Sequence, residues 1–370
     1  MKKFDFLKYN KEIFSLKLSI TNACNLRCQY CFVNKKNDFM DLNTAEKTIR
    51  FFLSSLGKNK VLIIYGGEPL LHPFWQKIIL IAERIAKKFH KRLIIGLPTN
   101  GLLVNKENLS FLKKHKIILS ISIDGDKNTH DKNKRFPNNM GTFNFLLKDI
   151  KLAFGFLGAK NVSALMTITP DSSKYLYKNF LFVIKLGFSR IHIDPVHGAD
   201  WDLRQKREFI LNFRQIVDFC FKSIKNNRFI FLCPLFNSFT NPLIKKQQNF
   251  SCPFYMDLEV YPQGELSFSQ FLINSSDEKI RNQAIIGNIR KNFLKENYKK
   301  CKHSKQCQSC LLNYYKFIDD PKFKGSELVE ERNKILEKFG DKIYSYSLKS
   351  KRYKRYYQKA SNLLLEKIII

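Results

Sequence analysis

A repeated alternation of strand-length and helix-length segments constrains the fold of this chain most strongly. Helical spacing of apolar residues fills the stretches between short apolar runs, as at Lys106–His115 and Thr142–Phe156, and Asn105 and Gly187 are expected helix caps. Strands that alternate with helices favour parallel pairing through right-handed crossovers. The pattern therefore predicts an α/β fold, a partial (β/α)6 barrel, with strands at Phe14–Ile20, Val61–Tyr65, Leu93–Leu97, Ile117–Ile123, Val162–Ile168 and Arg190–Asp194.

This alternation ends near residue 228. The following segment has two Cys-Pro pairs and a cluster of cysteines, and it predicts a small irregular Cys-rich C-terminal module with a hairpin around Gly264. From about Lys322 the chain is charged and has the composition of helices. We therefore expect three domains, at 14–228, 229–321 and 322–370, the last of them a basic helical tail.

Composition narrows the class of protein. The chain has 370 residues, of which 44% are hydrophobic and 14% aromatic, and this excludes a disordered protein. No apolar run reaches the length of a membrane span, and the first residues lack the apolar segment of a signal peptide. We expect a cytoplasmic protein without a membrane partner.

The net charge of +33 attracts nucleic acids, anionic membranes and acidic proteins alike. Basic and aromatic residues interleave at 349–357, so phosphate contacts and base stacking are available there, and a nucleic-acid partner for this basic tail is one hypothesis. The alternative is an amphipathic terminal helix that packs on the body of the protein.

Active sites of parallel α/β folds collect in the loops that follow the carboxyl ends of the strands. Asp194 and His197 close the sixth predicted strand and its loop, and they are our candidates for substrate contact or proton transfer. The alternative is that Asp194 caps a turn and that the histidines are solvated.

Three cysteines occupy the loop after the first predicted strand. Cys24, Cys28 and Cys31 supply three thiolates, which suit three corners of a cube-shaped iron–sulfur cluster and leave one iron open for a substrate or cofactor. A zinc knuckle is the alternative, but structural zinc sites take four ligands, and no fourth Cys or His is near in sequence.

The Cys-x3-Cys-x2-Cys spacing, with an aromatic residue before the last cysteine, resembles the signature of the radical S-adenosylmethionine (SAM) superfamily. The resemblance covers about residues 14–228. It implies that the three cysteines hold a [4Fe–4S] cluster and that SAM chelates its fourth iron. Reductive cleavage of SAM then yields a 5′-deoxyadenosyl radical that takes a hydrogen atom from the substrate.

Further loops match the same family. The sequence Gly66-Gly67-Glu68-Pro69 resembles its GGEP motif, in which the glutamate can bind the ammonium of SAM. The resemblance also implies cofactor contacts by Asn100 and by Ser122, the latter to the ribose. In a segment similar to the family's His-Asp-x-x-Arg, Lys134 takes the arginine position and Arg135 follows it, so either cation can meet the cofactor carboxylate.

The C-terminal cysteines resemble a shortened SPASM or Twitch module of the peptide- and protein-modifying branch, which includes anaerobic sulfatase maturases. One auxiliary [4Fe–4S] cluster or a structural zinc ion is expected there, and its four predicted ligands are Cys252, Cys301, Cys307 and Cys310. Cys233 could replace Cys252, and Cys220 is predicted to be a buried apolar cysteine.

The resemblance predicts an enzyme that modifies a peptide or protein side chain. Gln270 stands where the sulfatase maturases have an aspartate base, which disfavours formylglycine formation. A one-electron reductant such as flavodoxin or ferredoxin is the expected partner. The alternatives are a radical SAM enzyme that acts on RNA, a nucleotide, a carbohydrate or a small metabolite, and a zinc-stapled nucleic-acid-binding protein without catalysis.

Overall fold

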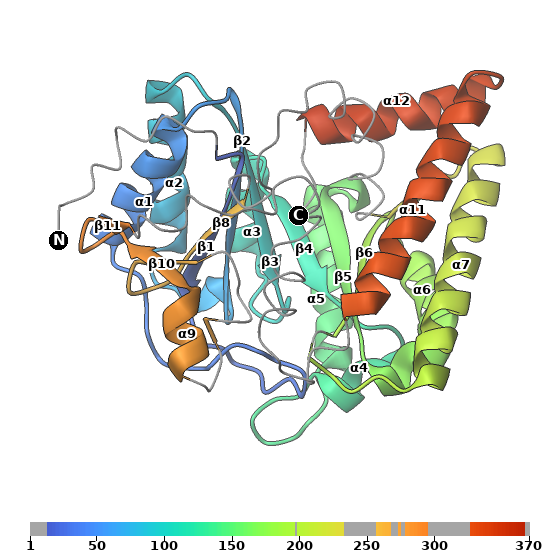
Figure 1. Ribbon diagram of the computed structural model, residues 1–370, viewed down its shortest axis with the longest axis horizontal. Coiled ribbons are helices and arrows are strands. Elements are labelled where there is room, and N and C mark those ends of the chain that lie inside the picture. The colour runs from blue at the N-terminus through green and yellow to red at the C-terminus, as the bar shows by residue number, and fades with distance from the viewer. Residues whose placement is uncertain are drawn as a thin grey trace. The chain divides into compact units, whose positions relative to one another are not determined.

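The computed structural model describes residues 13–196, 198–232, 257–267, 273–274, 278–294 and 326–366 (Figure 1). Short 3₁₀ helices are labelled η. In chain order the elements are β1 (Ser15–Thr21), α1 (Leu42–Ser54), β2 (Asn59–Gly66), η2 (Pro69–Leu71), α2 (Trp75–Lys88), β3 (Arg92–Thr99), α3 (Lys106–Lys114), β4 (Ile118–Ser122), α4 (Lys127–Asn133), α5 (Phe143–Leu157), η3 (Ala159–Asn161), β5 (Val162–Ile168), η4 (Pro170–Tyr175), α6 (Leu176–Leu186), β6 (Arg190–Pro195), α7 (Leu203–Lys225), β7 (Phe231–Leu232), β8 (Asp257–Val260), β9 (Glu265–Ser267), α9 (Glu278–Ala284), β10 (Ile285–Asn288), β11 (Phe293–Leu294), α11 (Ser326–Ser347) and α12 (Lys351–Glu366).

The chain divides into two compact units, each formed from several stretches of sequence. The first unit comprises residues 1–25, 31–99 and 249–318, and the second comprises 26–30, 100–248 and 319–370. The predicted domain boundaries at 228 and 321 follow the sequence rather than this division, and they remain predictions.

The first unit is built on strands in the order β11-β10-β9-β8-β1-β2-β3. The strand β1 pairs in parallel with both β2 and β8, whereas β8, β9 and β10 pair in antiparallel fashion. Strand β1 lies inside the sheet, and Leu16, Leu18 and Ile20, which share one of its faces, are fully buried. The β8–β9 hairpin turns at Gly264, as predicted, and the backbone φ of this glycine is 83°.

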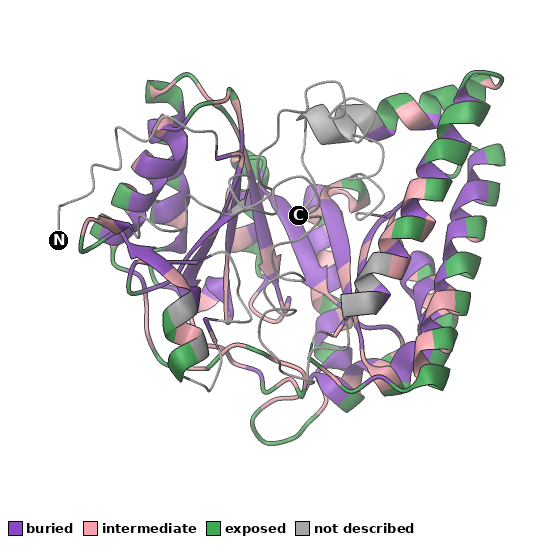
Figure 2. Cartoon of the chain, viewed as in Figure 1, coloured by how far each residue is buried: buried purple, intermediate pink, exposed green. Residues whose placement is uncertain are grey.

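The second unit contains the parallel strands β4, β5, β6 and β7 in that order. The long helix α7 packs against α6, and both α11 and α12 pack against α7 (Figure 1). Tyr356 of α12 is 1% exposed, and its hydroxyl donates to the carbonyl of Ile230 at 2.9 Å. Exposed residues line the outer faces of α7 and α12 (Figure 2). The tail thus contains an amphipathic helix packed on its unit, as the alternative interpretation of the basic segment predicts.

Local capping interactions determine where several helices begin and end. Asn105 precedes α3 and its side chain accepts from the Asn108 N–H at 2.8 Å, and Gly187 ends α6 with a φ of 115°; both caps were predicted. A capping box of Asp202 and Gln205 starts α7. In the part of the chain that the structure describes, no helix combines the length and apolar character needed to cross a membrane.

Candidate functional site

The glycine motif after β2 lies directly beside the start of the cysteine loop after β1. The Gly67 N–H donates to the carbonyl of Thr21, and the Glu68 N–H donates to the carbonyl of Ala23, both at 2.8 Å. A Cβ atom on Gly67 would lie 2.3 Å from the Ala23 oxygen, so a side chain there would force the two segments apart. The pair of glycines is therefore required by this close approach of two backbones.

Glu68 is fully buried and holds the end of the glycine motif in place. Its carboxylate accepts from the Leu70 N–H at 3.1 Å, which caps η2, and from the Thr99 hydroxyl at 2.8 Å. These contacts join the carboxyl ends of β2 and β3. Contact of Glu68 with a cofactor ammonium stays a prediction.

Polar contacts close the neck of the cysteine loop. The backbone N–H and side-chain amide of Asn22 both donate to the Asp38 carboxylate at 3.0 Å, and Thr21 is bridged to Phe39 in antiparallel fashion. The loop between these contacts lacks helices and strands. Its shape depends on its ends and on what its side chains bind.

The donor chemistry of this loop fits an iron–sulfur cluster. Cys24, Cys28 and Cys31 are each half-buried, so their thiols are neither sealed in the core nor fully solvated. A four-iron cluster needs thiolates for its separate iron corners, and this loop supplies three.

The middle of the cysteine loop, counted in the second unit, binds the segment that follows α4. The Arg27 N–H donates to the carbonyl of Arg135 at 2.8 Å, and the Gln29 N–H donates to the carbonyl of Asn133 at 3.0 Å. The Tyr30 hydroxyl donates to the Asp124 carboxylate at 2.7 Å. The aromatic position of the cysteine motif thus anchors the loop to the end of β4.

Lys134 forms a buried ion pair beneath this loop. Its side chain is 7% exposed, and its ammonium lies 3.9 Å from the Asp124 carboxylate and 5.1 Å from the centre of the Tyr30 ring. Burial would lower the pKa of Lys134, but Asp124, Tyr30 and Cys28 raise it above its usual value. Lys134 therefore stays protonated at neutral pH and contributes positive charge beside Cys28.

Arg135 differs from its neighbour in its surroundings. It is half-buried, and its Nε donates to the carbonyl of Asp131 at 2.8 Å. Nearby, the buried His130 contacts the Thr142 hydroxyl, and burial lowers the pKa of His130 to about 3. This histidine is therefore neutral and structural at pH 7.

The other two predicted cofactor contacts follow strands of the site. Asn100 comes directly after β3, is half-buried and accepts from the Leu102 N–H at 3.0 Å. Ser122 is half-buried at the last position of β4. Both occupy carboxyl ends of strands, where the fold predicts functional residues.

The structure places Asp194 near the end of β6, in an ion pair that the sequence did not reveal. Its carboxylate contacts the guanidinium of Arg332 on α11 and the imidazole of His192. Arg332 is 7% exposed and also donates to the carbonyl of Ile193 at 3.0 Å. Asp194 therefore contacts two side chains of its own unit. His197 lies outside the described residues.

The four predicted ligands of the auxiliary site, Cys252, Cys301, Cys307 and Cys310, and the alternative ligand Cys233 also lie outside the described residues. Cys220 on α7 is fully buried, as predicted, and burial raises the pKa of its thiol. Its thiol stays protonated, which suits a packing role.

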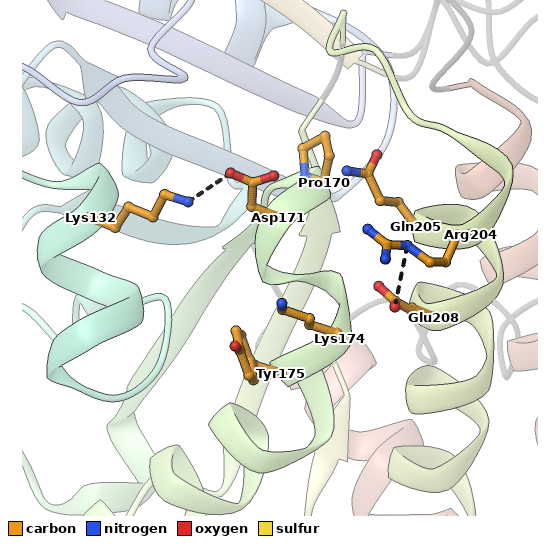
Figure 3. A pocket seen from close by; sticks show the side chains of 8 residues that line it. All are labelled: Lys132, Pro170, Asp171, Lys174, Tyr175, Arg204, Gln205 and Glu208. Carbon is orange, nitrogen blue, oxygen red and sulfur yellow. Dashed lines mark hydrogen bonds and ion pairs between the residues drawn. The ribbon is translucent and has the colours of Figure 1, made fainter.

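A cavity of about 200 Å³ opens where η4 follows β5 (Figure 3). Lys132 faces Asp171 at 2.7 Å across it, and Arg204 lies 3.9 Å from Glu208. Lys174 also lines this cavity, with its ammonium 5.0 Å from the Tyr175 ring. Most of the charges in this cavity are thus balanced by neighbours, and their exposure to solvent weakens each pair.

Comparisons with known proteins agree with this arrangement. Residues 18–171 match the family model of the radical SAM superfamily. A cysteine-type anaerobic sulfatase-maturating enzyme of Clostridium novyi is 26% identical over 335 residues, which cover 82% of this chain and 86% of that protein.

Solved structures of low sequence identity share the fold. The structure of anSMEcpe with bound AdoMet and Kp18Cys peptide has a TM-score of 0.64 at 19% identity, covering 87% of this chain and 99% of that one. Streptococcus suis SuiB bound to its precursor peptide SuiA has a TM-score of 0.53 at 14% identity, covering 73% of this chain and 62% of that one.

Fold, loop motifs and sequence matches together define the class of the protein: the chain carries a radical SAM domain and is a radical SAM enzyme. The predicted α/β fold with a parallel sheet core is confirmed. A [4Fe–4S] cluster and SAM are the cofactors of this class. More particularly, the chain is similar to anaerobic sulfatase-maturating enzymes over most of its length.

Proposed function

We propose that this radical SAM enzyme modifies a side chain of a peptide or protein substrate. When bound, the cluster and SAM supply a 5′-deoxyadenosyl radical that removes a hydrogen atom from the substrate. One observation carries the proposal: the Gly66–Glu68 backbone is bonded along Thr21–Ala23, which places the glycine motif beside the three-cysteine loop. The similarity to a sulfatase-maturating enzyme and to peptide-bound structures supports a peptide substrate.

In this proposal Cys24, Cys28 and Cys31 hold the cluster, and the half-buried backbone of Gly66 and Gly67 lines the methionyl part of SAM. The remaining predicted contacts are Glu68, Asn100 and Ser122. Cys252, Cys301, Cys307 and Cys310 are proposed to hold one auxiliary cluster or zinc ion. Asp194 and His197 are proposed to contact the substrate or move a proton. A flavodoxin or ferredoxin is proposed as the electron donor.

The two neighbouring cations have different roles in this proposal. Lys134 is committed to Asp124 inside the protein, whereas Arg135 is half-buried and presents a planar guanidinium that can bind a carboxylate with two hydrogen bonds. We assign the cofactor carboxylate to Arg135. Replacement of Arg135 by Gln should weaken SAM binding about tenfold in calorimetry without changing the iron content.

Anaerobic purification and reconstitution test the proposed function. The wild type should carry about eight irons per chain if both sites hold four-iron clusters, and about four if only the cysteine loop does. It should release 5′-deoxyadenosine with dithionite. The triple Cys24/Cys28/Cys31→Ala variant should lose about four irons and all of this activity.

Cys220→Ala is the matched control, because it also removes a thiol, but from a buried position on α7 outside the cysteine loop. This variant should keep the wild-type iron content and 5′-deoxyadenosine release. Zinc without iron in the wild type, and no cleavage of SAM, would overturn the proposal. A search for a modified peptide by mass spectrometry then tests the substrate class separately.

A further inference from the structure

A second cavity, of about 310 Å³, lies in the first unit beside the cysteine loop. One wall comes from the neck of that loop, at Asn22 and Asp38, and another from the turn of the β8–β9 hairpin. Most of its lining residues are polar or charged, and the apolar part of the lining includes Tyr261 and Ile273. We call this cavity the hairpin pocket.

Glu265 contributes a half-buried carboxylate to the hairpin pocket. In the described part of the chain, no lysine or arginine makes an ion pair with it, although Lys36 and Arg281 also line the pocket. The other carboxylate of the pocket, that of Asp38, already accepts two hydrogen bonds from Asn22. Glu265 is held by backbone hydrogen bonds from its own N–H and that of Gln263, and its charge is left for a cationic ligand to pair with.

A cation near Glu265, Arg290, is held by other partners. Arg290 acts on Glu265 only through its field, since its guanidinium donates to the Asp41 carboxylate at 2.6 Å, to the Gln263 amide at 2.7 Å and to the Thr44 hydroxyl at 2.8 Å. Burial raises the pKa of Glu265, backbone hydrogen bonds and Arg290 lower it, and the nearby Asp38 carboxylate raises it; burial is the largest of these effects. A cation in the pocket would stabilise the charged form of Glu265.

We propose that the hairpin pocket binds a lysine or arginine side chain of the peptide substrate, with Glu265 as its ion-pair partner. Both side chains have an apolar stem that can lie along Tyr261 and Ile273 while the charged end reaches the carboxylate. Amides at the rim, from Asn34 and Asn274, can bind the peptide backbone. The inference rests on the proposed function and gives its substrate a chemical class.

Fluorescence anisotropy with short labelled Gly/Ser peptides tests the proposal. The peptides differ in one central residue, which is lysine, arginine, glutamine or glutamate, and the buffer contains about 150 mM salt to screen the net charge of the protein. The wild type should bind the lysine and arginine peptides about tenfold more tightly than the glutamine peptide. Glu265→Gln should abolish this preference, and Glu265→Lys should transfer it to the glutamate peptide.

Glu107→Gln is the matched control, since Glu107 is an exposed glutamate on α3. It makes the same change of charge and should keep the preference. A wild type without preference for cationic peptides, or a preference that survives in Glu265→Gln, overturns the inference alone. If no peptide binds the wild type, the peptide substrate class fails with it, whereas 5′-deoxyadenosine release still reports whether the enzyme is a radical SAM enzyme.

Discussion

Lys134 was one of two cations predicted to bind the cofactor carboxylate, but in the fold it pairs with a carboxylate of the protein itself. Its ammonium and the Asp124 carboxylate are both buried, and the Tyr30 hydroxyl completes the group. Burying two charges is costly, and the cost is offset only while both charges are present. Lys134 therefore helps to hold the cysteine loop in place through Asp124 and Tyr30.

Replacement of Lys134 by Met should lower the free energy of unfolding by about 3–5 kcal/mol, because it leaves the buried Asp124 carboxylate without its cation. The Lys134→Met/Asp124→Asn double variant should recover part of this loss. Urea denaturation of the single and double variants measures both values. A loss below about 1 kcal/mol in Lys134→Met would show that the pair contributes no more than an exposed one.

His130 should make stability depend on pH. Its folded-state pKa of about 3 lies below the unfolded value of 6.5, so between these values the unfolded chain binds a proton that the native protein does not. The contribution is complete above about pH 6.5 and is lost as the pH falls towards 3. Between pH 7.5 and 5.5 the wild type should lose about 1.4 kcal/mol more than His130→Gln. Equal losses in urea melts of the two proteins would contradict the assignment of a neutral buried histidine.

At the scale of elements, the contact between the glycine motif and the cysteine loop decides whether the site can form. A Cβ atom at Gly67 would meet backbone oxygens rather than a movable side chain. The two loops follow neighbouring parallel strands, so strand pairing brings them together and the glycines permit the last approach.

Gly67→Ala should lower the free energy of unfolding by about 1–3 kcal/mol through overpacking and reduce the iron retained after reconstitution. Gly155→Ala is the control: Gly155 lies inside α5, and a Cβ there meets no atom within 4 Å. This control should gain about 0.5–1 kcal/mol and keep its iron. Equal changes in the free energy of unfolding and in the retained iron for the two variants would show that the close approach at Gly67 is not required for the site.

Tyr356 fixes helix α12 to the rest of its unit. The ring of Tyr356 stacks on that of Phe231, with centroids 5.3 Å apart, and its hydroxyl bonds the backbone before β7. Tyr356→Phe should cost about 1 kcal/mol, the net value of one hydrogen bond, whereas Tyr356→Ala should cost about 3–5 kcal/mol. Hydrogen exchange should then show α12 protected in the first variant and deprotected in the second. Unchanged protection in Tyr356→Ala would contradict this packing.

At the scale of the whole molecule, the net charge of +33 attracts polyanions over the whole surface. Tyr353 and Tyr356 of α12 are buried and cannot stack on bases, while the cations between them are exposed. We expect weak binding to single-stranded DNA that falls steeply with salt.

Neutralising Lys354 and Arg355 to Gln should reduce the slope of log K against log salt by about two, as expected for two lost phosphate contacts. Filter binding at several salt concentrations measures it, with Tyr357→Ala as a control that should leave affinity unchanged. Binding that persists at high salt or depends on Tyr357 would favour the nucleic-acid hypothesis.

Features that depend on residues close together in the sequence, such as strand positions and helix caps, were predicted well. The six core strands lie close to their predicted positions because apolar periodicity is local, and the caps at Asn105 and Gly187 follow from residues beside them. The predicted loop motifs also follow their strands. The partners of site residues were not predictable in this way, because Arg332 and Asp194 are 138 residues apart and no local pattern marks either of them.

The pairing of β1 with β8 has a consequence for how the chain is made. Lys17 of β1 and Glu259 of β8 form an ion pair although they are 242 residues apart. At a synthesis rate of about 5–20 residues per second, one edge of the first strand waits roughly 10–50 s for its neighbour after leaving the ribosome. An unpaired strand edge is a template for aggregation, so this edge of β1 is the part of the nascent sheet most open to wrong pairing until the hairpin arrives.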